Sequence, residues 1–184
     1  MKTITKIAFI LSLAFLTSCQ GEQGPPGVDG LNGLDGTSLL GSVFEITGTF
    51  DQSNDYSLHF NFPSDFEIYT SDIVMVYILW GQTNDAEPLD IWQPLPHNTL
   101  LGSGEILQYN FDYTVADVYI YLDATVDRST LSEGDTNNQT FRIAVMPAAF
   151  ATDKSVNLNS LGSVMKAMKI TSNGIQTLDV SKPM

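Results

Sequence analysis

Four stretches of this chain alternate apolar and polar side chains with a period of two, and this pattern restricts the fold more than any other feature. In the first stretch, Leu58 and Phe60 alternate with His59 and Asn61. Successive side chains of a β-strand point to opposite faces, so each stretch predicts a strand with one buried and one exposed face. The four stretches are residues 56–62, 107–113, 118–126 and 141–145.

Other segments add strands to this set. Residues 43–50 and 175–180 are predicted as the first and last strands, and residues 73–80 are apolar throughout, which is typical of a strand covered on both faces. Turn-forming clusters separate the strands, with no regular alternation of strands and helices. We therefore predict an all-β domain over residues 42–184, an antiparallel β-sandwich of the immunoglobulin-like or jelly-roll-like kind.

One C-terminal helix is predicted within this domain. Leu161, Val164, Met165 and Met168 are spaced as i, i+3, i+4 and i+7, which places them on one face of a helix. Residues 157–160 contain the asparagine and serine residues that commonly cap a helix N-terminus. The spacing of the methionines is typical of core packing.

The residues before Cys19, the single cysteine of the chain, have the layout of a secretory signal. Lys2 and Lys6 precede an apolar run at residues 7–16, which is too short for a membrane-spanning helix of about twenty residues. The tetrapeptide Leu-Thr-Ser-Cys that ends at Cys19 resembles the lipobox of bacterial lipoproteins. The resemblance implies removal of residues 1–18 as a lipoprotein signal peptide and acylation of Cys19. The alternative is an ordinary signal peptide that leaves one free thiol.

Glycine recurs at every third position through six triplets that follow Cys19. These glycines are Gly21, Gly24, Gly27, Gly30, Gly33 and Gly36. Collagen needs this spacing because only glycine fits beside the axis of its triple helix. Together with the lipobox, the triplets resemble the short collagen-like lipoproteins of flavobacteria and their relatives, and this resemblance covers residues 1–38.

Residues 19–41 are accordingly predicted to form a lipidated, collagen-like linker. Only one triplet carries prolines, Pro25 and Pro26, and the three acidic residues of the triplets have no lysine or arginine nearby. Three parallel strands would bring these like charges close together. We therefore favour an extended spacer of up to about 55 Å, at roughly 3.1 Å per residue, over a homotrimer.

The distribution of charge excludes some partners. The formal charge is −13, and residues 20–127 hold seventeen acidic residues but no lysine or arginine. Binding of nucleic acid is excluded, because phosphate contacts need clustered cations. A divalent cation such as calcium would relieve the repulsion. However, Asp51, Ser53 and Asp55 match only the first positions of a helix-loop-helix calcium loop, so we expect no metal site and no cofactor.

No catalytic constellation is recognisable in the sequence. His59 and His97 are the only histidines, neither lies in a metal-binding or nucleophile motif, and both are predicted on exposed surface, His97 in a loop. Asp112, Asp117 and Asp123 lie on or near predicted strands and are candidates for the paired carboxylates of glycoside hydrolysis. An acidic chain yields such pairs by composition alone.

Trp80 and Trp92 are the candidate ligand-binding residues. With nearby amide and acidic side chains they would form an aromatic platform of the type that holds sugars. The alternative, which we favour, is that Trp80 ends a buried strand and packs in the core. Trp92 lies in residues 90–96, which are predicted as an exposed loop.

These observations predict a lipoprotein that is anchored to a membrane of the bacterial cell envelope and presents a non-enzymatic binding or structural domain. The outer membrane is the expected site. The first alternative is a carbohydrate-binding or adhesive module, and the second is a glycoside hydrolase. The expected partners are the membrane, reached through the lipid, and a polysaccharide or another envelope protein.

Overall fold

A computed structural model of the chain describes residues 41–102 and 104–179. The chain divides into two units, Met1–Gly36 and Thr37–Met184, and all the described residues belong to the second. The predicted signal peptide, Cys19 and the six triplet glycines lie outside the described residues.

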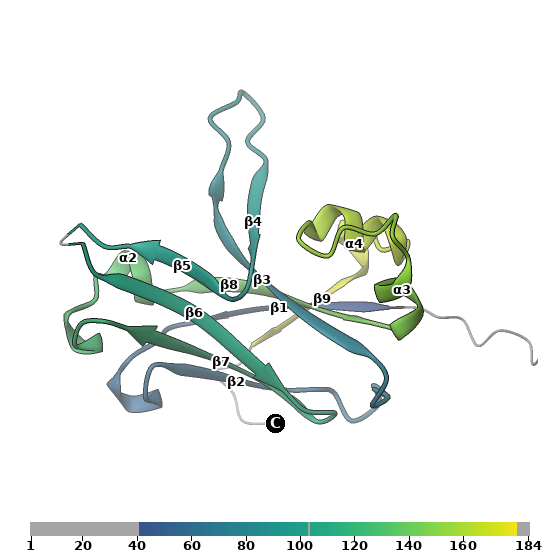
Figure 1. Cartoon of the computed structure of the whole chain (residues 1–184), viewed down its shortest axis with the longest axis horizontal. Coiled ribbons are helices and arrows are strands. Elements are labelled where there is room, and N and C mark those ends of the chain that lie inside the picture. Colours follow the sequence, from purple (N-terminus) through teal and green to yellow (C-terminus); the bar gives the residue numbers. More distant parts are fainter. Residues whose placement is uncertain (1–40, 103, 180–184) are drawn as a thin grey trace, which may run out of the picture. The chain divides into compact units, whose positions relative to one another are not determined.

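Nine strands form two sheets in the described part of this unit (Figure 1). Sheet A has the strand order β4-β3-β8-β1-β9, and sheet B has the order β2-β7-β6-β5. Sheet A consists of β1 (Ser42–Gly48), β3 (Ile73–Gln82), β4 (Asp90–Pro94), β8 (Gln139–Met146) and β9 (Ile175–Asp179). Sheet B consists of β2 (Ser57–Asn61), β5 (His97–Leu100), β6 (Ile106–Tyr113) and β7 (Asp117–Ala124).

Three short α-helices and three 3-10 turns accompany the strands within residues 41–102 and 104–179. The helices are α2 (Glu133–Thr136), α3 (Ala148–Thr152) and α4 (Leu161–Ala167). The turns are η2 (Gln52–Asn54), η3 (Arg128–Thr130) and η4 (Ser172–Gly174). In the described part of the chain, no helix has the length and apolarity that crossing a bilayer requires.

The main hydrophobic core lies between the two sheets, because one cluster of buried residues draws on the inward faces of both. Its members from sheet A include Phe44, Ile46, Val76, Ile78, Phe141 and Ile143, and those from sheet B include Leu58, Phe60, Leu107, Tyr109, Ile120 and Leu122. Those from residues 58–60, 107–109, 120–122 and 141–143 are apolar positions of the alternating stretches, so burial is confirmed at these positions. The domain is mostly β and its two packed sheets are compatible with a β-sandwich.

Aromatic rings link the two inward faces. The centroid of the Phe44 ring lies 5.3 Å from that of Phe60 and 5.0 Å from that of Phe66. The Phe50 and Phe141 rings meet edge to face at 5.9 Å. Such pairs contribute about 0.5–1.5 kcal/mol each beyond the burial of their area. The core therefore connects the sheets through ring contacts as well as through aliphatic packing.

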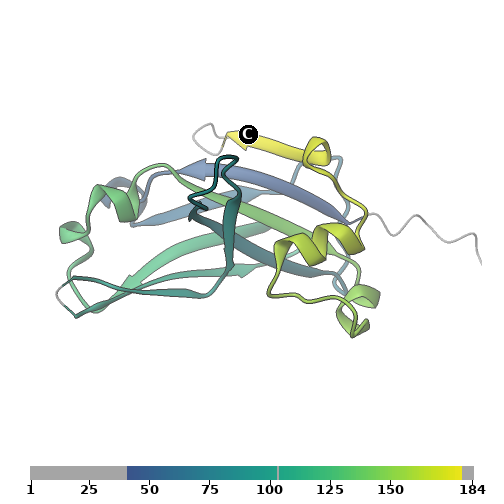
Figure 2. The ribbon, with the colours of Figure 1, turned by 90° about the horizontal axis from the view of Figure 1, so that it is seen from above.

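The other face of sheet A carries a second hydrophobic cluster, which α4 covers. Leu161, Val164 and Met168 of the α4 segment are buried against Val43 and Tyr77. Both α3 and α4 lie on the side of sheet A that faces away from sheet B, and α4 crosses that side in the view from above (Figures 1 and 2). The part of sheet A that carries Val43, Tyr77, Ala144 and Met146 is thus covered on both faces.

This second cluster confirms two sequence-based predictions. The Ser160 side chain accepts a hydrogen bond from the Ser163 N–H, so the helix begins where its capping residues predict. The apolar run of β3 has a buried residue on each face, as Val76 packs in the main core and Tyr77 in the second cluster. Burial on both faces explains why the sequence of β3 does not alternate.

The structure corrects the predicted topology at three places. First, β9 pairs with β1 in parallel, whereas an antiparallel arrangement was predicted throughout. Second, residues 90–94 of the predicted 90–96 loop form β4, which pairs with β3 along the edge of sheet A. Third, His97 lies in β5 and not in a loop. Both missed strands are short edge strands, where proline and polar residues are tolerated and the alternating pattern is weak.

The packing of the helical segment on sheet A is tested by Tyr77→Phe. Tyr77 is fully buried and its hydroxyl donates a hydrogen bond of 2.6 Å to the Leu158 carbonyl oxygen. Burial also raises the pKa of this hydroxyl, so it stays protonated. Removing it leaves that carbonyl unpaired, and we expect the free energy of unfolding to fall by about 1–3 kcal/mol in urea denaturation.

Tyr69→Phe is the matched control, because Tyr69 is 58% exposed. Its unfolding free energy should change by less than about 0.5 kcal/mol. Equal stability of Tyr77→Phe and the unmodified protein would contradict the described packing.

Candidate functional site

The face of sheet B that points away from sheet A carries an ordered array of polar and aromatic side chains. We call this array the outer face of sheet B. It consists of His59 and Asn61 on β2, Asn98 on β5, Gln108, Asn110 and Asp112 on β6, and Asp117, Tyr119, Tyr121 and Asp123 on β7. They alternate with the buried positions of the same strands, so strand geometry directs them outward.

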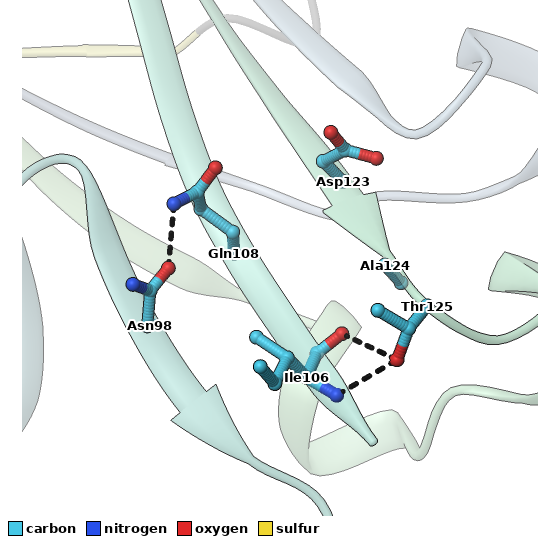
Figure 3. A pocket seen from close by; sticks show the side chains of 6 residues that line it. All are labelled: Asn98, Ile106, Gln108, Asp123, Ala124 and Thr125. Carbon is cyan, nitrogen blue, oxygen red and sulfur yellow. Dashed lines mark hydrogen bonds between the residues drawn. The ribbon is translucent and has the colours of Figure 1, made fainter.

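Strand register arranges these side chains in rows across the sheet. Asn98 pairs with Gln108, and Gln108 pairs with Asp123. The Gln108 Nε2 donates a hydrogen bond of 2.6 Å to the Asn98 Oδ1 (Figure 3). Figure 3 shows the three side chains in sequence across β5, β6 and β7. The row therefore presents two amides and a carboxylate side by side.

A shallow hollow of about 260 Å³ lies at this row. Its lining residues are Asn98, Ile106, Gln108, Asp123, Ala124 and Thr125. The Thr125 hydroxyl accepts a hydrogen bond of 2.9 Å from the Ile106 N–H, which holds the rim (Figure 3). Ile106 is 46% exposed and faces its cross-strand neighbour Leu100, which is 73% exposed. The hollow thus combines polar groups with an apolar margin.

Aromatic side chains occupy the other end of the same face. Tyr119 lies between Asp112 and His59 in the register of the sheet. Its ring centroid is 6.2 Å from that of His59 and 5.8 Å from that of Tyr121. Tyr119 is exposed, so part of its ring is accessible from solvent.

Asp117 anchors this aromatic end. Its Oδ2 accepts a hydrogen bond of 2.8 Å from the His59 Nε2, and its Oδ1 accepts another from the Thr114 hydroxyl. The Thr114 hydrogen bond, followed by that from His59, lowers the pKa of Asp117 below its ordinary value. Asp117 is therefore ionised at neutral pH and orients the His59 ring beside Tyr119.

All four strands of sheet B come from the cation-free part of the sequence, so the outer face of sheet B carries no lysine or arginine. Arg128 follows β7, but its Nη2 lies 2.7 Å from the Asp55 Oδ1 and its Cζ lies 4.9 Å from the centre of the Tyr56 ring. The face is therefore negative through Asp112, Asp117 and Asp123.

The two tryptophans do not form one platform, because they lie on opposite faces of sheet A. Trp92 is half-buried on the outer face of this sheet, where the Arg142 Cζ lies 4.1 Å from the centre of its ring. The Arg142 Nε donates a hydrogen bond of 2.9 Å to the Glu45 Oε2. One face of the Trp92 ring is thus already used by a paired guanidinium.

Trp80 lies at the opposite side of the β3–β4 hairpin, at the margin of the main core. Its ring centroid is 4.3 Å from that of His97 and 6.4 Å from that of Tyr109. The predicted burial of Trp80 is wrong, since the residue is 42% exposed. The predicted exposure of His97 is also wrong, since it is half-buried and burial lowers its pKa. His59, in contrast, is exposed as predicted.

The three aspartates considered for glycoside hydrolysis all lie on the outer face of sheet B. Asp117 and Asp123 are six positions apart on β7, about 20 Å at roughly 3.4 Å per residue, whereas the chemistry needs about 5–9 Å. Asp112 is closer to Asp117 but lies on the open sheet surface. The lowered pKa of Asp117 does not suit a general acid. This geometry does not favour the hydrolase alternative.

The residues considered for calcium have other partners in the structure. Asp51 accepts a hydrogen bond from the Ser53 hydroxyl and caps η2 by accepting others from the Ser53 and Asn54 N–H groups. The hydroxyl contact, followed by the Ser53 N–H, lowers the pKa of Asp51. Asp55 pairs with Arg128. Among residues 41–102 and 104–179, no three His, Cys, Asp or Glu side chains gather as a metal ion would require.

Comparison with known proteins adds no family to these observations. No protein-family model, no curated protein and no solved structure matches the chain. Its function is therefore argued from its own residues.

The sequence predicted part of the outer face of sheet B but did not single it out. Alternation placed His59, Gln108, Asn110 and Asp112 on polar strand faces. It missed Asn98, because β5 was not predicted, and it missed the convergence of the rows, because this depends on strand register. Planar polar residues recur at every second position of neighbouring strands, and this recurrence is the sequence feature that could have indicated the face.

The hydrogen bond at Asp117 is tested by Thr114→Val. The variant lacks the hydroxyl that most lowers the pKa of Asp117, so we expect this pKa to rise toward the ordinary value of 3.8 in an NMR titration of the carboxyl carbon. Since the pKa of Asp117 is lowered in the folded state, its ionised form stabilises the fold at pH values above the ordinary pKa. That contribution is lost as pH falls through the lowered value.

Thr125→Val is the control, because Thr125 bonds Ile106 at the other end of the face. It should leave the Asp117 titration unchanged. An unaltered Asp117 pKa in Thr114→Val would show that the hydroxyl contact is not formed in solution.

Proposed function

We propose that this protein is a lipid-anchored component of the bacterial cell envelope that presents a non-catalytic binding domain. In this proposal the leader is removed, Cys19 carries the lipid, and residues 20–41 hold the domain away from the membrane. The layout of the leader, the position of the single cysteine and the six glycine triplets support it. Two or more acyl chains give a lasting anchor, whereas one gives a marginal one.

The outer face of sheet B is the observation that carries the binding role. Sheet A packs against sheet B through one face and against α4 through part of the other. The outer face of sheet B instead presents aligned amides, carboxylates and tyrosines beside a hollow. Polar side chains held on strands are positioned more firmly than those on loops, which lowers the entropy lost when a ligand binds.

The finer features of the fold belong to the same proposal. The domain is a β-sandwich of the immunoglobulin-like or jelly-roll-like kind, preceded by a signal peptide and a collagen-like linker. The mature protein faces outward from a membrane of the envelope, with the outer membrane as the proposed site. Its strongly acidic composition supports solubility and keeps the domain from anionic lipid headgroups.

Metabolic labelling with an alkynyl fatty acid tests the anchor. We expect label on the intact protein and none on Cys19→Ala, because the thiol is the acylation site. Ser18→Ala is the matched control, since it keeps a small side chain before the cysteine, and it should label normally. Normal labelling of Cys19→Ala, or an unlabelled native protein, would refute the anchor.

Analytical sedimentation tests the role of the triplets. We expect the mature chain without lipid and a form that also lacks residues 20–38 to sediment as monomers, because charge repulsion and the scarcity of proline disfavour a triple helix. A trimer that dissociates when these residues are removed would contradict the spacer and establish a collagen-like assembly.

A further inference from the structure

The outer face of sheet B has the chemistry of a surface that recognises hydroxyl groups. Asn98 and Gln108 supply planar amides, and Asp123 supplies a carboxylate in the same row (Figure 3). Amides both donate and accept hydrogen bonds, and carboxylates accept them through two oxygens. Neighbouring hydroxyls on a sugar ring, which donate and accept in the same way, match such a row.

The aromatic end of the face supplies the complementary apolar contact. Tyr119 is 38% exposed, and the His59 and Tyr121 rings flank it. An aromatic ring offers a flat apolar surface to the C–H face of a sugar, while its hydroxyl remains available for a hydrogen bond. The Asp117 contact orients His59, so this end of the face is held in place before a ligand arrives.

We infer that the outer face of sheet B binds an uncharged polysaccharide. The absence of lysine and arginine from its strands, together with Asp112, Asp117 and Asp123, repels acidic sugars and phosphate. A cationic partner would find only these three separate carboxylates to pair with. The amides and tyrosines suit neutral, hydroxyl-rich chains. The proposal therefore commits to neutral sugars.

The dimensions of the face suit a chain of several sugar units. Asp117 and Asp123 mark its ends along β7, about 20 Å apart at roughly 3.4 Å per residue. The hollow beside Gln108 receives part of the chain, with the exposed side chains of Leu100 and Ile106 against its apolar edges. Tyr119 stacks on a sugar farther along. The inference rests on the proposed function, since it assigns a ligand to the proposed binding domain.

Affinity electrophoresis of the lipid-bearing protein in a detergent without sugar headgroups tests this inference. The neutral probes are laminarin, dextran, yeast mannan, galactan and arabinoxylan, and the acidic probes are alginate and polygalacturonate. We expect at least one neutral probe to retard the protein and neither acidic probe to do so. Retardation by an acidic probe alone, or by none of the seven, overturns the inference.

Substitutions on the outer face of sheet B test whether the polysaccharide binds there. Tyr119→Ala and Gln108→Ala should each weaken binding of the retarding probe by about tenfold or more, as expected when a central contact is lost. Tyr69→Ala and Gln176→Ala are the matched controls, because both residues are exposed and lie outside this face, and they should bind normally. Unchanged affinity in both face variants, or equal losses in the controls, contradicts the assignment.

A measurement of folding distinguishes the loss of a ligand contact from the unfolding of a variant. Thermal unfolding should show that each variant remains folded at the temperature of the assay. If Gln108→Ala is unfolded, Asn98→Ala replaces it, because Asn98 is exposed on an edge strand. The lipid-labelling result is independent of glycan binding, so loss of the anchor and loss of the ligand are distinguishable.

Discussion

The burial of sheet A between two apolar layers is the constraint on which the rest of the structure depends. One cysteine in the whole sequence allows no disulfide within the chain, so packing must hold the domain. Phe44 and Phe141 pack toward sheet B, while Val43 and Tyr77 pack toward the α4 layer. Since β1, β3 and β8 contribute to both clusters, disruption of either layer weakens the strands that the other layer uses.

The two sheets differ in how many of their faces take part in packing. Sheet A contributes to both hydrophobic clusters, and its polar side chains at the surface, such as Arg142 and Glu45, bond one another. Sheet B buries only its inward face in the main core, which leaves its outward positions free of packing constraints. Polar and aromatic residues accumulate there without cost to the core, and strand register brings them into rows. The proposed ligand site thus follows from the unequal covering of the two sheets.

Sequence patterns predicted most of the long strands and α4, because period-two and period-3.6 burial are local properties of the chain. They did not predict β4 and β5, since short edge strands are stabilised by pairing rather than by their own composition. The parallel pairing of β9 with β1 and the separation of Trp80 from Trp92 depend on contacts between distant segments. The proposed ligand site could be predicted only as polar strand faces, without the register that aligns them.

In the described part of the chain, sheet A buries Tyr77 toward α4, whereas the outer face of sheet B exposes Tyr119. Hydroxyl-radical footprinting of individual tyrosines is the sharpest test of this difference and of the proposed ligand site. We expect rapid modification of Tyr119, slow modification of Tyr77 and Tyr109, and slowing at Tyr119 but not at Tyr69 when the retarding polysaccharide is present. Modification of Tyr77 as fast as that of Tyr119, or a Tyr119 rate that saturating polysaccharide leaves unchanged, would contradict it.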